Sequence, residues 1–102
     1  MAKMSSQWPG LPADAGLDLL GHEILAEKAA ALGRSAQKAE QALARLRVHQ
    51  GGEDDRKALV KAAADAVYAY FVQRELCGFR RHDEIIRDYA IPGEVLVRLG
   101  AR

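Results

Sequence analysis

Residues able to do chemistry gather between Glu75 and Ile86, in the run ELCGFRRHDEII. This run holds Cys77, the only cysteine of the chain, and His82, one of its three histidines. Nearby positive charge or a helix N-terminus turns a cysteine into a reactive thiolate. Arginines flank Cys77 in the sequence, but we expect Cys77 at a helix C-terminus, whose dipole disfavours an anion. The favoured interpretation is therefore a buried, unreactive thiol.

The sequence gives less support to two further kinds of site. Cys77 and His82 could form a nucleophile and base across a turn, but no Gly-rich oxyanion loop lies near them. His22 and Glu23 are adjacent, so they point to different faces of a helix, and no H-E-x-x-H pattern occurs. A two-fold dimer could still bring copies of His22 or Glu27 together. We expect no catalytic residue, no metal and no cofactor.

The charges around His82 favour a structural joint between two helices. Arginine forks pair well with carboxylates, and such a network could fix the angle of the last helices or bind a small anion or partner peptide. Bracing is the favoured interpretation, because single surface pairs are weak. The candidate polar ligand or partner site comprises Arg74, Arg80, Arg81, His82 and Asp83.

The C-terminal run DEIIRDYAIPGEVLVRLG offers an alternative function. Its pattern of helix, tight turn and helix over residues 83–99 resembles a helix-turn-helix reader of DNA. However, Ala90 stands where a turn glycine is expected, and the second helix is poor in side chains that read bases. We favour two short helices that seal one end of a bundle.

Helical spacing of apolar residues dominates the rest of the chain. Gly51 and Gly52 interrupt it, with left-handed geometry expected there and Glu53 to Asp55 expected to cap the next helix. Lys61 and Asp65 are spaced as an i,i+4 pair. Residues 1–13, with Trp8 and two prolines, are predicted to form a tail before a single domain over residues 14–102. The predicted helices span residues 16–49, 54–77, 82–89 and 92–99.

An all-α fold with a shallow core follows from this pattern. The chain has 102 residues and a formal charge of +1, and many of its apolar residues are Ala, which adds little buried area. A long antiparallel hairpin of this kind needs a partner, so we predict a dimeric four-helix bundle. The candidate residues for the dimer seam are Leu25, Leu32, Leu43, Leu46, Val60, Tyr68 and Val72.

Composition narrows the class of protein. The nearly balanced charge does not favour binding to nucleic acid or to an anionic membrane. No apolar segment of the sequence is long enough to cross a bilayer. A single cysteine fits a reducing compartment, and the N-terminus lacks the apolar run of a signal peptide, so a cytoplasmic location is expected. We predict a non-enzymatic interaction or assembly protein that acts as a homodimer.

The runs LLGHEILAEKAAALGR and AYFVQRELCGFRRHDEIIRDYAIPGEVLVRLG resemble a family of small uncharacterised bacterial proteins. The resemblance covers most of the chain after the tail. It implies a bacterial helical domain and carries over no functional residues.

Overall fold

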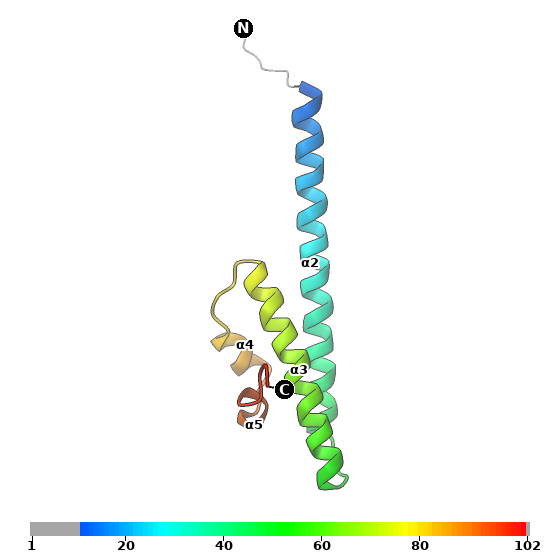
Figure 1. The fold of residues 1–102 in the computed structure, drawn as a ribbon, viewed down its shortest axis with the longest axis vertical. Coiled ribbons are helices and arrows are strands. Elements are labelled where there is room, and N and C mark those ends of the chain that lie inside the picture. Colours follow the sequence, from blue (N-terminus) through cyan, green and yellow to red (C-terminus); the bar gives the residue numbers. More distant parts are fainter. Residues whose placement is uncertain (1–10, 102) are drawn as a thin grey trace. The chain divides into compact units, whose positions relative to one another are not determined.

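The computed structural model describes residues 11–101, with side chains from Asp18 onward, and the predicted all-α fold is confirmed over that range (Figure 1). Two long helices are followed by two short ones, as the sequence predicts. None of the helices within the described range is long and apolar enough to span a membrane. The four helices are α2 (Leu11–Arg47), α3 (Glu53–Leu76), α4 (Asp83–Asp88) and α5 (Gly93–Leu96).

The start of α2 differs from the predicted start near residue 16. The helix begins at Leu11, so residues 11–13 of the predicted tail are helical. Pro12 is compatible with this start because the first-turn N–H that it lacks would have no partner within the helix. The rest of the predicted tail, with Trp8, lies outside the described residues.

The chain divides into two compact units, and the boundary falls inside α2 after Ala30. In the first unit, every described side chain from Asp18 to Ala30 is exposed. Its exposed side chains include four large apolar ones, Leu19, Leu20, Ile24 and Leu25. This stretch of helix therefore presents apolar surface that no described residue covers.

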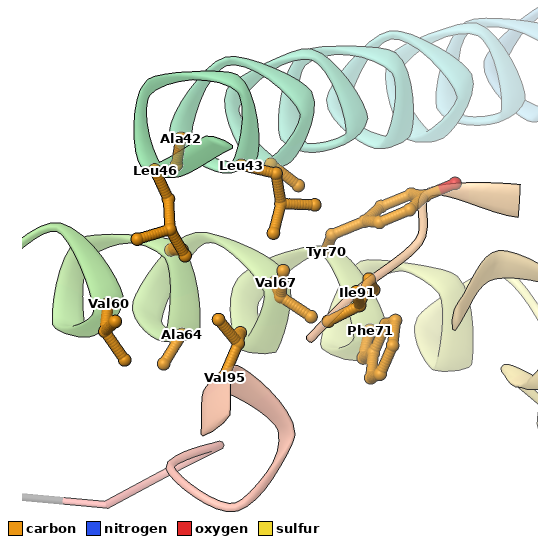
Figure 2. Close-up of a cluster of buried hydrophobic side chains, with 12 residues drawn as sticks. Ala42, Leu43, Leu46, Val60, Ala64, Val67, Tyr70, Phe71, Ile91 and Val95 are labelled. Atoms are coloured by element: carbon orange, nitrogen blue, oxygen red, sulfur yellow. The ribbon is translucent and has the colours of Figure 1, made fainter. Parts of the chain in front are cut away.

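The second unit, from Ala31 onward, contains the hydrophobic core. Residues 39–46 of α2 pack on α3, and fully buried Ala39 and Ala63 let the helices approach closely. In Figure 2, Val95 of α5 and Ile91 lie against α3 near Val67 and Phe71. The C-terminal segment thus packs against α3. The buried residues are Ala39, Ala42, Leu43, Leu46, Val60, Ala63, Ala64, Val67, Tyr70, Phe71, Ile91 and Val95.

The turn between α2 and α3 is made differently from the prediction. Gly52 is the N-cap of α3 with extended geometry, at φ −77° and ψ 177°, and no side chain caps that end. The expected left-handed glycines and the expected caps from Glu53 to Asp55 are therefore wrong. Instead, the His49 ring bridges the turn, with Nδ1 3.4 Å from the Gly51 N–H and Nε2 3.2 Å from the Gly52 carbonyl oxygen.

Left-handed geometry occurs at the ends of α3 and α4. Gly78 follows α3 at φ 97°, and Ala90 follows α4 at φ 49°. In each case the next residue donates to the carbonyl five positions earlier: Phe79 to Arg74 at 2.9 Å, and Ile91 to Ile86 at 3.0 Å. Both ends are Schellman motifs. The expected helix end at Cys77 is confirmed, since Cys77 is the C-cap of α3. Ala90 takes the role of Gly78 at the end of α4, although it carries a Cβ.

The seven candidates for the dimer seam fall into two groups. Leu43, Leu46 and Val60 are buried in the core of the single chain, where α2 and α3 cover each other. They serve this core and do not face outward. Leu32 is half-buried against the core, and the exposed candidates are Leu25, Tyr68 and Val72.

Candidate functional site

The joint between α3 and α4 is built around the side chain of His82, which is only 13% exposed. Its ring stacks on Phe71 of α3, with centroids 4.1 Å apart and planes tilted by 6°. Arg74 Nε lies 3.0 Å from His82 Nδ1. Because a guanidinium only donates hydrogen bonds, Nδ1 accepts and the ring proton sits on Nε2. That nitrogen donates to Glu75 Oε2 at 3.0 Å.

Arg74 connects the two sides of the joint. Its Nη2 donates to the Arg81 carbonyl oxygen at 2.8 Å, in addition to the bond with His82. The guanidinium carbon also lies 5.0 Å from the Phe79 ring centroid and 5.9 Å from that of Tyr70. One side chain thus contacts the end of α3, the turn and the start of α4, and this favours bracing over catalysis.

The other predicted site residues lie at the edge of the joint. Arg81 Nη2 pairs with Asp83 Oδ2 at 3.0 Å, but both side chains are largely exposed. Arg80 is exposed beside the joint. The structure therefore brings four of the five predicted residues into one bonded cluster.

This arrangement limits the chemistry of the joint. Both ring nitrogens of His82 already have partners, so the ring cannot serve as a general base without losing one of them. Cys77 is half-buried at the C-cap of α3, and its N–H donates to carbonyl oxygens of the last turn. Within the described residues, no group of three or more His, Cys, Asp or Glu side chains is positioned to hold a metal ion.

An open groove of about 560 Å³ runs along the joint. Its charges are balanced, since three arginines face three carboxylates, so the groove does not select ligands by charge. Arg74 and Arg81 line it, while His82 does not. The lining residues are Arg74, Phe79, Arg81, Asp83, Glu84, Ile85, Arg87 and Asp88.

A second groove, of about 530 Å³, lies between α2 and the end of α4. The Tyr89 ring at its wall stacks on Tyr70, with centroids 5.9 Å apart. Burial, hydrogen bonding with Tyr70 and the nearby Glu40 carboxylate raise the pKa of Tyr89 above its ordinary value. Arg47 Nη2 approaches the Tyr89 carbonyl oxygen at 3.4 Å. The phenol therefore stays protonated here and contributes packing.

Sequence reasoning missed the aromatic part of the joint. The stack of Phe71 on His82 joins residues 11 positions apart across a turn. Phe79 follows the turn glycine, and this is the Schellman position whose side chain often contacts the last helical turn. The position of Phe79 directly after Gly78 could therefore have predicted its contact with Arg74.

The contacts of the last helix, α5, are relevant to the alternative function as a helix-turn-helix DNA-binding protein. Helix α5 is a single turn whose Val95 is fully buried in the core. Glu94 forms an ion pair with Arg56 of α3. These contacts attach α5 to α3, and no described contact favours the reading of DNA bases, so that alternative stays a prediction.

Comparison with known proteins gives one result. No curated protein and no solved structure was found to match the chain. A match to a family of unknown function covers residues 10–102, nearly the whole sequence. The resemblance to an uncharacterised helical family is thereby confirmed: the chain belongs to the family of unknown function DUF6665.

Proposed function

We propose that this protein is a non-enzymatic assembly protein that acts as a homodimer in the bacterial cytoplasm. One observation carries the proposal: the first unit exposes large apolar side chains on a helix. Leu19 is 65% exposed, Leu20 55%, Ile24 56% and Leu25 66%. Covering each such side chain with a partner contributes about 1.5–3 kcal/mol. A second copy of the chain is the occupant we propose, because closed two-fold dimers are the commonest oligomers.

The assignment as a non-enzymatic protein rests on the joint. Its histidine and arginine are engaged with one another and with neighbouring rings, as expected for a brace. The cytoplasmic assignment rests on the single cysteine, which cannot form a disulfide within the chain.

Sedimentation equilibrium at micromolar concentration tests the proposal. We expect a mass twice the 11.1 kDa of the chain. Replacing both Leu20 and Ile24 with Gln, a good helix former, is expected to weaken the dimer by about tenfold or more for each side chain. The matched control is Val97→Gln, because Val97 is 82% exposed but belongs to the second unit.

Two results would contradict the proposal. One is a wild-type chain that stays monomeric up to high micromolar concentration. The other is a dimer that Val97→Gln disrupts while the Leu20 and Ile24 replacements leave it intact, because the contact surface would then lie elsewhere.

A further inference from the structure

The ring of His82 is held in one orientation by contacts on three sides. It stacks on Phe71 with planes tilted by 6°, and only 13% of the side chain is exposed. Nδ1 accepts from Arg74 Nε at 3.0 Å, and Nε2 donates to Glu75 Oε2 at 3.0 Å. Turning the ring over would place a C–H group toward each of these partners. The neutral ring therefore satisfies both hydrogen bonds only as it lies here.

A second proton on this ring has one place to bind. Nε2 already carries a proton, so the added proton binds Nδ1, which then becomes a donor. Arg74 Nε is also a donor, since a guanidinium has no acceptor. The hydrogen bond between Arg74 and His82 is therefore incompatible with a protonated ring. In general an imidazole exchanges this proton between about pH 5 and about pH 8.

The charged groups around the ring respond to that proton in different ways. On α3, the Glu75 carboxylate gains an ion pair with the imidazolium, whereas the Arg74 guanidinium meets a like charge. At the start of α4, the Asp83 carboxylate is already paired with Arg81 at 3.0 Å. The other ionisable side chains next to the ring in the sequence are Cys77, Arg80 and Glu84. The protonated ring thus keeps Glu75 as its partner and loses Arg74.

We infer that His82 is a proton-operated switch in the joint between α3 and α4. With a neutral ring, Arg74 bonds to Nδ1. When solvent supplies the second proton, the ring keeps its stack on Phe71 and its contact with Glu75, and the Arg74 side chain moves away. This inference concerns the joint alone and does not depend on the proposed homodimer.

Movement of Arg74 changes two further parts of the joint. Its Nη2 donates to the Arg81 carbonyl oxygen at 2.8 Å, and its guanidinium carbon lies 5.0 Å from the Phe79 ring centroid. The same side chain lines the open groove of about 560 Å³, which His82 does not line. Proton uptake by a mostly buried ring therefore alters the wall of an exposed groove.

Nuclear magnetic resonance of the full chain tests the switch. The ring nitrogens of His82 report the proton. The δ-methylene signals of Arg74 report its side chain, because the rings of Tyr70 and Phe79 beside the guanidinium shift them. Between about pH 8 and about pH 5 we expect both sets of signals to move with one midpoint. Circular dichroism should show unchanged helix content over the same range.

Two variants separate His82 from other groups. His82→Gln supplies an amide that can accept from Arg74 and donate to Glu75 but takes up no proton in this range, so its Arg74 signals should not change with pH. His49→Gln is the matched control, because the His49 ring also bridges a turn through both nitrogens. This control should leave the joint shift of the His82 and Arg74 signals as it is in the wild type.

Each other outcome would overturn the inference. Arg74 signals that stay constant while His82 titrates would show that the side chain does not respond. A His82 ring that takes up no proton above about pH 5 would remove the trigger. A pH-dependent Arg74 shift that persists in His82→Gln would assign the response to another group. Loss of helix content with the same midpoint would show unfolding instead of a switch.

Discussion

Helix α2 carries the same kind of apolar residue in two different environments. Leu25 and Leu46 occupy equivalent heptad positions, three heptads apart, yet Leu25 is 66% exposed and Leu46 only 4%. In the second unit, α3 supplies the side chains that cover Leu46. In the first unit, no described residue covers Leu25. Heptad spacing therefore predicts which face is apolar but not whether the chain itself provides the partner.

The largest effect is expected from truncating the buried member of this pair. Leu46→Ala should lower the free energy of unfolding by about 2–5 kcal/mol, since it removes buried apolar area and leaves a cavity. Leu25→Ala should change it by less than about 0.5 kcal/mol when the chain is monomeric. Urea unfolding at low protein concentration measures both. Equal losses would show that Leu25 is covered within the single chain, and the comparison would fail.

Within the second unit, the joint allows a similar comparison between a mostly buried side chain and an exposed one. His82→Ala removes the stack on Phe71 and the hydrogen bond from Arg74. We expect a loss of about 1–3 kcal/mol in the free energy of unfolding. Arg80→Ala, an exposed position beside the joint, is the control and should cost less than about 0.5 kcal/mol. If His82→Ala leaves the free energy of unfolding unchanged, the His82 ring does not stabilise the joint.

The two left-handed turns should respond in opposite directions. Gly78→Ala places a Cβ at φ 97° and should destabilise the fold by about 1 kcal/mol. Ala90→Gly removes a strained Cβ at φ 49°, which stabilises the folded state by about 1 kcal/mol. Glycine also raises the conformational entropy of the unfolded chain, so the free energy of unfolding increases only slightly. Thermal unfolding of both variants checks the signs. Destabilisation by Ala90→Gly would mean that its methyl group contributes packing larger than the strain.

The smallest effect concerns alkaline pH. Burial and contacts with Tyr70 and Glu40 raise the pKa of Tyr89. The unfolded chain then releases this proton first, so stability is unaffected below about pH 10 and falls as the pH rises above it. Tyr89→Phe should flatten this part of the decline, measured by urea unfolding between about pH 8 and about pH 11. Tyr68→Phe, at a half-exposed ring, should leave the slope as it is.

Local signals in the sequence determined the fold class and much of the element order. Apolar periodicity located the helices to within about five residues. The end of α3 at Gly78 was predictable because only glycine readily adopts its φ. The pair of Lys61 and Asp65, 3.0 Å apart, follows from helical spacing alone. The charged residues of the joint were also visible, because they are neighbours in the sequence.

Tertiary packing decided what local signals leave open. Arg56 and Glu94 pair across 38 positions, and His82 stacks on Phe71 across a turn; neither contact has a local spacing rule. Ala90 adopts left-handed geometry against its own preference because Ile91, beyond it, is buried in the core. The sequence alone determined which residues would form helices and which faces would be apolar, because those properties depend on near neighbours. Which apolar residues became core, and which stayed exposed, depended on the distant segments that the folded chain brings against them.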